Sequence, residues 1–150
     1  ARHLERRGID ALHISAGNYA SFAKGVLISP MAIPDAPLVH LAVAVTKAVS
    51  IPVIAVNKIR TPALAEETLR DGAADFIALG RSLLADPDWP IKAQASRDEE
   101  IMPCVACNQE CIGRLFAQRD IGCTVNPAVG RERAFAKPTT KPQRVMVIGG

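Results

Sequence analysis

The sequence is poor in aromatic residues and has no apolar stretch long enough to cross a membrane. Only 4% of its 150 residues are Phe, Trp or Tyr, so a core must be built from the abundant aliphatic side chains. No apolar run approaches the roughly 18 residues of a membrane span. The formal net charge of +3 is small and dispersed, which argues against a nucleic-acid or membrane partner.

The chain also lacks the marks of an exported protein. Its first residues, Ala-Arg-His-Leu-Glu-Arg-Arg-Gly, have the pattern of a helix end and not of a signal peptide. No cysteine occurs outside residues 104–123, which disfavours the disulfide framework of a small secreted chain. We therefore expect a cytoplasmic protein whose cysteines are reduced.

The few cysteines lie close together. Their order is Cys104, Cys107, Cys111 and Cys123, spaced C-x2-C-x3-C and then, after 11 residues, C. Thiolates are soft ligands that suit iron–sulfur clusters, zinc or copper(I). Three close sulfurs and a remote one can enclose a cubane cluster, whereas zinc sites more often pair two C-x2-C knuckles. The spacing favours a [4Fe–4S] cluster; a structural module in which the four cysteines bind zinc, without catalytic activity, is the alternative, and free thiols remain a third.

Short apolar strands alternate with helices ahead of the cysteines. The patterns predict strands over residues 9–15, 52–56 and 75–81, and helices over residues 38–49, 62–71 and 91–97. Thr61 is expected to cap the second helix, with Pro62 at its first position. Residues 20–37 form a connection with three prolines, long enough to be functional. The alternation implies parallel β/α units, although three strands cannot close a barrel.

Polar residues follow each predicted strand. In a β/α barrel, residues just past the carboxyl ends of the strands face the active site, and the last two loops frequently hold a phosphate. Here these loops contain Lys58 and the pair Gly80-Arg81; the two cations suit a dianion, and glycine lets the main chain approach it. Tyr19, the only tyrosine, follows the first strand and is a candidate proton donor.

The end of the chain has a different pattern. Residues 138–143 form a Pro/Lys/Thr linker with little apolar content. Arg144-Val-Met-Val-Ile then leads into Gly149 and Gly150, the pattern of a strand that enters a glycine turn. Dinucleotide-binding βαβ units open in this way, so both glycines are candidate cofactor-binding residues.

Four segments occur together in one order: PVIAVNKI from residue 52, ADFIALGRSLLADPDWP from residue 74, PCVACNQEC from residue 103 and CTVNP from residue 123. In this the chain resembles, over nearly its whole length, NADH:flavin oxidoreductases of the 2,4-dienoyl-CoA reductase and enoate reductase type, in the old yellow enzyme superfamily. The resemblance implies an α/β fold that is a fragment of a larger protein. Residues 1–100 would form the last three β/α units of an FMN-binding TIM barrel, 101–130 the [4Fe–4S] segment, 131–143 a linker, and 144–150 the start of a Rossmann-like FAD/NAD(P) domain.

The resemblance also implies a reaction. Electrons would pass from NAD(P)H to FAD, through the cluster to FMN, and then as hydride to the activated C=C bond of a small unsaturated acid or acyl-CoA. The four cysteines match the cluster ligands. Lys58, Gly80 and Arg81 match FMN contacts, and the backbone near Asn108 and Gln109 would lie close to the flavin.

One feature of some relatives is missing. Certain dienoyl-CoA reductases carry a Trp-His pair after the sixth barrel strand, whereas the corresponding segment here is Ala-Gly-Asn-Tyr from residue 16. The difference weakens an assignment to dienoyl-CoA itself and leaves Tyr19 as a candidate replacement. Because three parallel strands leave sheet edges uncovered, the isolated chain is expected to be inactive.

Overall fold

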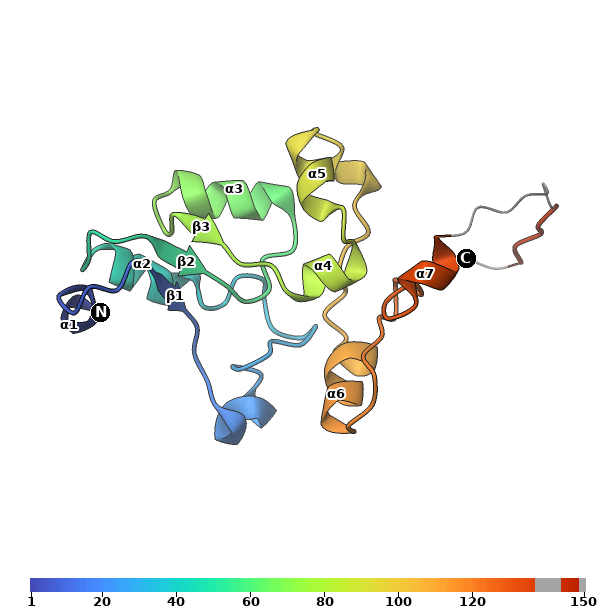
Figure 1. Ribbon diagram of the computed structural model, residues 1–150, viewed down its shortest axis with the longest axis horizontal. Coiled ribbons are helices and arrows are strands. Elements are labelled where there is room, and N and C mark those ends of the chain that lie inside the picture. Colours follow the sequence, from blue (N-terminus) through green and yellow to red (C-terminus); the bar gives the residue numbers. More distant parts are fainter. Residues whose placement is uncertain (137–143, 149–150) are drawn as a thin grey trace.

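A small parallel sheet forms the centre of the computed structural model, which describes residues 1–136 and 144–148. Its strands are β1 (Leu12–Ile14), β2 (Val53–Ala55) and β3 (Phe76–Ile77), paired in that order (Figure 1). Leu12 lies opposite Val53, and Ile54 lies opposite Phe76. The parallel strands confirm the α/β alternation predicted from the sequence.

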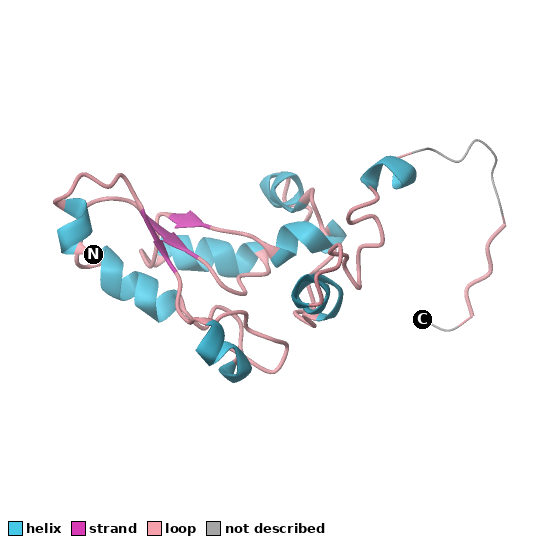
Figure 2. Ribbon diagram, turned by 60° about the horizontal axis from the view of Figure 1, so that its bottom comes forward, coloured by secondary structure: helices cyan, strands magenta, loops and turns pink. Residues whose placement is uncertain are grey.

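Helices flank the sheet, and short helices joined by loops follow it along the chain (Figure 2). The α-helices are α1 (Arg2–Glu5), α2 (Val39–Thr46), α3 (Pro62–Arg70), α4 (Arg81–Ala85), α5 (Trp89–Gln94), α6 (Arg114–Phe116) and α7 (Glu132–Phe135). The segments η1 (Tyr19–Lys24) and η2 (Asp98–Glu100) are 3-10 helices, and η3 (Gln109–Gly113) is a π-helix. Thr61 caps α3 as predicted: its hydroxyl accepts a hydrogen bond from the Leu64 N–H at 3.3 Å.

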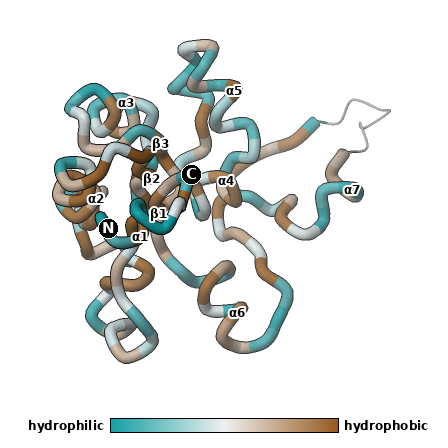
Figure 3. Tube along the Cα trace, turned by 60° about the vertical axis from the view of Figure 1, so that its left-hand side comes forward, coloured by the Kyte–Doolittle hydropathy of each residue, from teal (hydrophilic) through white to brown (hydrophobic). Residues whose placement is uncertain are grey.

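The core lies between the sheet and the helices that follow its strands. Helix α2 packs on β1 and β2, and α3 packs on β3. The apolar stretches of the chain gather around these strands (Figure 3). The buried cluster consists of Ala42, Val53, Ala55, Ile59, Ala65, Ala74 and Trp89.

The third strand is shorter and more exposed than the sequence indicated. Only Phe76 and Ile77 pair with β2, and Arg81 already begins α4. Phe76 is 58% exposed, and β3 is an edge strand in the described part of the chain, so the strand predicted over residues 75–81 was too long.

The C-terminal part differs from the sequence prediction in two places. Helix α7 (Glu132–Phe135) lies within the expected linker 131–143. Residues 144–148 form no strand, and Val145 and Ile148 are 80% and 90% exposed, because no described segment pairs with them. The predicted glycine pair, Gly149 and Gly150, lies outside the described residues. None of the described helices is long and apolar enough to span a membrane.

The turn after β1 depends on a glycine. Gly17 has φ +96°, and a Cβ placed there would lie 2.9 Å from both the Cα and the N of Leu27. Gly17→Ala is therefore expected to lower the free energy of unfolding by about 1–3 kcal/mol through overpacking, beyond the cost of its left-handed backbone. Gly8→Ala is the matched control, because Gly8 has φ +82° and no neighbour within 4 Å. Urea denaturation of both variants measures the difference, and equal losses would contradict the clash.

Candidate functional site

A cavity of about 340 Å³ opens at the carboxyl ends of the three strands. Because parallel strands end at one edge of the sheet, residues far apart in the sequence meet there. Its wall consists of His13 in β1, Ser15 and Ala16 after it, residues 56–60 after β2, Ala78 and residues 80–82 after β3, and Leu27, Ile28, Leu38, Cys104 and Ile112. The structure thus brings the predicted residues Lys58, Gly80 and Arg81 to one cavity.

The segment between β3 and the first turn of α4 offers main-chain donors to this cavity. Gly80 is the N-cap of α4, and Arg81 and Ser82 are its first residues, so their N–H groups have no intrahelical acceptor. Within residues 1–136 and 144–148 no other group accepts from these N–H groups. A Cβ added at Gly80 would meet nothing within 4 Å, so a ligand can approach the main chain there. Orphan N–H groups beside an arginine are a suitable environment for a phosphate.

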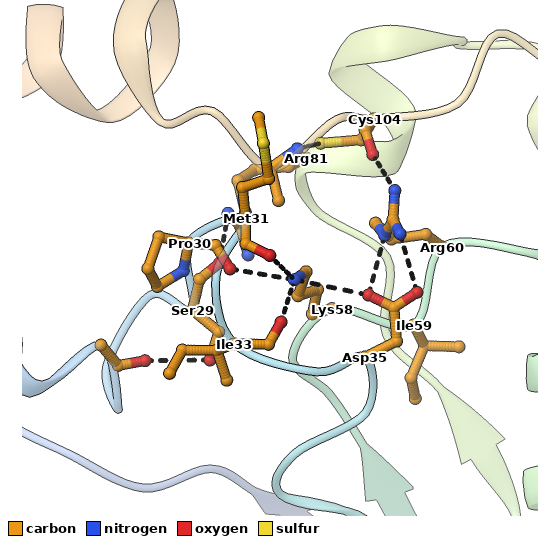
Figure 4. Close-up of polar contacts among 12 residues, drawn as sticks. Ser29, Pro30, Met31, Ile33, Asp35, Lys58, Ile59, Arg60, Arg81 and Cys104 are labelled. Atoms are coloured by element: carbon orange, nitrogen blue, oxygen red, sulfur yellow. Dashed lines mark hydrogen bonds and ion pairs between the residues drawn. The ribbon is translucent and has the colours of Figure 1, made fainter.

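Lys58 has a different set of contacts from the one expected. Its side chain is buried, and its ammonium donates to the carbonyls of Pro30 at 2.9 Å, Met31 at 3.3 Å and Ile33 (Figure 4). The Asp35 carboxylate lies 3.5 Å away. Lys58 therefore holds residues 30–35 against the end of β2, and direct contact between its ammonium and FMN stays a prediction.

Arg60 continues this network toward the cysteines. Its guanidinium donates to both carboxylate oxygens of Asp35, at 2.9 and 2.8 Å, and to the carbonyl of Cys104 at 2.6 Å (Figure 4). The Arg60 guanidinium holds the pKa of the Asp35 carboxyl below its usual value. The Trp89 indole N–H donates to the Arg60 carbonyl at 3.1 Å, which joins the network to the core.

Arg81 connects the cavity to the cysteine segment as well. Its Nη1 donates to the carbonyl of Ser29 at 2.9 Å and to Oδ1 of Asn108 at 2.5 Å. Asn108, which has φ +59°, donates in turn from Nδ2 to the Ile28 carbonyl at 3.3 Å. The predicted residues Arg81 and Asn108 are therefore hydrogen-bonded to each other, and each also donates to a carbonyl of residues 28–29.

A second cavity contains all four cysteines. Its wall consists of Arg81, Leu84, Cys104, Val105, Cys107, Asn108, Glu110, Cys111, Cys123, Thr124 and Val125. None of the cysteines is in a disulfide. The π-helix η3 (Gln109–Gly113) carries Cys111, and the left-handed Asn108 redirects the chain between Cys107 and this helix. The fold thus brings Cys123 into the same cavity as the other three cysteines, although 11 residues separate it from Cys111 in the sequence.

The donor set of the second cavity is of a kind that both iron–sulfur clusters and zinc use. Four thiolates around one zinc all lie about 2.3 Å from it. Among the described residues, no three His, Cys, Asp or Glu side chains converge closely enough to hold one metal ion. A cubane holds its thiolates at separate corners, so four sulfurs that line one cavity fit it in number and chemistry.

Two of the thiols differ in their electrostatic environment. Burial raises the pKa of Cys107, but hydrogen bonds from the Thr124 hydroxyl and the Gln109 N–H, with the charge of Arg81, outweigh it and leave this pKa below its usual value. Burial raises the pKa of Cys111, and the hydrogen bonds and the nearby Arg81 only partly offset it. The positive charge of Arg81 thus acts on the cysteine cavity from the wall that both cavities share.

Two polar side chains anchor the cysteine segment to the helices. Asp86 is buried; it accepts from the Met102 N–H at 2.9 Å and pairs with Lys92 at 2.6 Å. Burial opposes ionisation of Asp86, but these partners outweigh it and keep its pKa below the usual value. Asn126 donates to the Leu84 carbonyl at 2.9 Å. The segment is thus held on both sides of its cysteines.

Two other predicted residues lie away from the first cavity. Tyr19 is 81% exposed and is not part of the cavity wall; its ring meets Phe116 of α6 edge to face, with centroids 6.5 Å apart. Gln109 is exposed, and its backbone faces Cys107. A catalytic role for Tyr19 and a flavin contact near Gln109 stay predictions.

Sequence reasoning missed several residues that assemble the site: Asp35, Asp86, Thr124 and Asn126. Asp35 lies in a proline-rich connection and Asp86 in a turn-like Asp-Pro-Asp, so both resemble solvated loop residues. Asn126 follows Cys123 closely, and that proximity was the one signal available.

The fold and the two cavities define a class of protein. It is a β/α protein in which a cavity suited to a phosphate, at the carboxyl ends of parallel strands, lies next to a cavity lined by four cysteines. The NADH:flavin oxidoreductase / NADH oxidase family matches residues 29–100. An NADH oxidase of Thermoanaerobacter brockii is 44% identical over 153 residues, covering 100% of this chain and 23% of its own length. A cinnamate reductase of Clostridium sporogenes is 32% identical over 151 residues, with 100% and 22% covered. The chain belongs to the NADH:flavin oxidoreductases of the old yellow enzyme type, as the resemblance indicated.

A solved structure agrees with this assignment. A 2-naphthoyl-CoA reductase in complex with 2-naphthoyl-CoA superposes with a TM-score of 0.75 at 31% identity, over 83% of this chain and 19% of that one. The chain spans less than a quarter of the length of each of these three proteins.

Proposed function

We propose that this chain supplies part of an FMN site and the ligands of a neighbouring [4Fe–4S] cluster in an NAD(P)H-dependent oxidoreductase that reduces an activated C=C bond. The observation that carries the proposal is the shared wall: Arg81 and Cys104 line both cavities. Groups bound in the two cavities would be separated by one layer of side chains, an arrangement that suits electron transfer.

Four residues of the first cavity have a defined task in this proposal. The N–H groups of Gly80, Arg81 and Ser82 hold the FMN phosphate, and the Arg81 guanidinium adds the charge that a dianion needs. Lys58 acts mainly by holding residues 30–35 beside the cavity. When bound, FMN supplies hydride transfer and the cluster supplies one-electron transfer; the chain positions both and leaves them adjacent.

The source of electrons and the substrate follow from the relatives. We propose that the chain works within a longer protein, since it spans 23% of the related NADH oxidase and leaves Phe76 on an uncovered edge strand. Residues 144–150 would then open an FAD/NAD(P) domain that accepts hydride from NAD(P)H. A small unsaturated acid or acyl-CoA is the substrate class, because relatives are named for cinnamate and 2-naphthoyl-CoA.

The intact protein tests this proposal directly. We expect a brown protein with iron and acid-labile sulfide at about four each per chain, because a cubane contains four of each. Acid precipitation should release FMN, and anaerobic oxidation of NADH or NADPH should be coupled to loss of the alkene absorbance of cinnamate. Elemental analysis, sulfide assay, flavin chromatography and the coupled assay measure these outcomes.

The alternative is a structural module in which the four cysteines bind zinc, without catalytic activity. Four cysteines in one cavity are compatible with it, but three closely spaced cysteines followed by a remote fourth are more typical of a cluster. Zinc at one per chain without sulfide or flavin would support the alternative and end the electron-transfer proposal.

A further inference from the structure

One polar side chain points at a cysteine sulfur. The Thr124 hydroxyl lies 3.2 Å from Sγ of Cys107, and both residues line the cysteine cavity. A sulfur bound to iron carries no proton, so in a cluster the hydroxyl must be the donor. Thr124 directly follows Cys123, so this hydrogen bond joins the two ends of the cysteine segment across 17 residues.

The other sulfur contacts come from the main chain. The Ala106 N–H donates to Sγ of Cys104 at 3.4 Å, and the Gln109 N–H donates to Cys107. Among the described residues, Thr124 is the one side chain that hydrogen-bonds a cysteine sulfur. A side chain, unlike a main-chain amide, can be replaced without moving the backbone that carries the ligands.

Hydrogen bonds to ligand sulfurs influence the redox behaviour of a cluster. A donor stabilises the more negative, reduced state more than the oxidised state, so it raises the reduction potential. We propose that Thr124 is a positioning residue that raises the reduction potential of the [4Fe–4S] cluster by donating to Sγ of Cys107. This inference rests on the proposed function, because it requires that the four cysteines hold a cluster.

Valine and serine substitutions test the proposal in the intact protein. Thr124→Val keeps the shape of the side chain but replaces the hydroxyl by a methyl group, whereas Thr124→Ser keeps the donor. The midpoint potential is measured by reductive titration followed by electron paramagnetic resonance, after iron and sulfide have been counted. We expect a shift to more negative potential in Thr124→Val and a potential near the wild-type value in Thr124→Ser.

The possible outcomes separate the two proposals. An unchanged midpoint in Thr124→Val, or an equal shift in both variants, would overturn the role of the hydroxyl. Absence of iron and sulfide from the wild-type protein would instead overturn the proposed function. Because the titration follows only molecules with an assembled cluster, incomplete assembly in a variant weakens the signal without displacing its midpoint.

Discussion

Replacement of Arg81 by glutamine is expected to weaken FMN binding by about 10- to 100-fold, because a charge-assisted hydrogen bond is worth about 1.5–3 kcal/mol. Arg81 lines the cavity at the strand ends, and its guanidinium is the cation beside the orphan N–H groups of Gly80 and Ser82. Titration of flavin-free protein with FMN, followed by flavin fluorescence, measures the dissociation constant.

Two further variants make this prediction specific. Arg81→Lys keeps the charge but loses the planar fork, so we expect an intermediate loss of affinity. Arg70→Gln removes an arginine that is 73% exposed on α3 and pairs only with Asp71 among the described residues, so it should leave the dissociation constant unchanged. Wild-type affinity in Arg81→Gln would contradict phosphate binding at this loop.

Asp35→Asn is expected to lower the free energy of unfolding by about 2–3 kcal/mol at neutral pH, because removing one partner leaves a partly buried cation unpaired. Asp35 accepts two hydrogen bonds from Arg60 and lies 3.5 Å from Lys58. Urea denaturation measures the loss. Asp71→Asn is the matched control: its exposed pair with Arg70 should contribute at most about 1 kcal/mol.

The same pair makes stability depend on pH in acid. Since Arg60 holds the pKa of Asp35 below its usual value of 3.8, the stabilisation is present above that value and is lost as the pH falls through the lower, folded-state pKa. Wild-type protein should therefore lose stability below about pH 4. Asp35→Asn lacks the carboxyl, so its stability should fall less over that range; parallel curves would contradict the role of the pair.

Local patterns in the sequence predicted the main strands and helices of residues 1–100 and the grouping of the cysteines. Strict alternation of apolar strands and helices predicted the parallel sheet, and Thr61-Pro62 predicted the start of α3, because both depend on residues next to one another in the chain. The cysteine spacing predicted a common site, and the four residues do line one cavity.

Longer-range contacts were beyond such patterns. The bond from Arg60 to the Cys104 carbonyl spans 44 residues, and that from Arg81 to the Ser29 carbonyl spans 52. Neither hydrogen bond can be recognised from a sequence pattern, because an arginine near a strand end has the same sequence context whether it is a surface charge or a site residue. The extent of β3 also depended on its neighbours, because an edge strand pairs on one side only.

By itself, then, the sequence determined which residue types stand at the strand ends and that four sulfurs lie within a short segment. Tertiary structure alone decided that Lys58 turns to loop carbonyls, that Tyr19 is exposed, and that Arg81 and Cys104 form one wall between two cavities. The physical reason is that backbone periodicity and spacing are local properties. The partner of a buried charge is whichever group the fold brings within hydrogen-bonding distance.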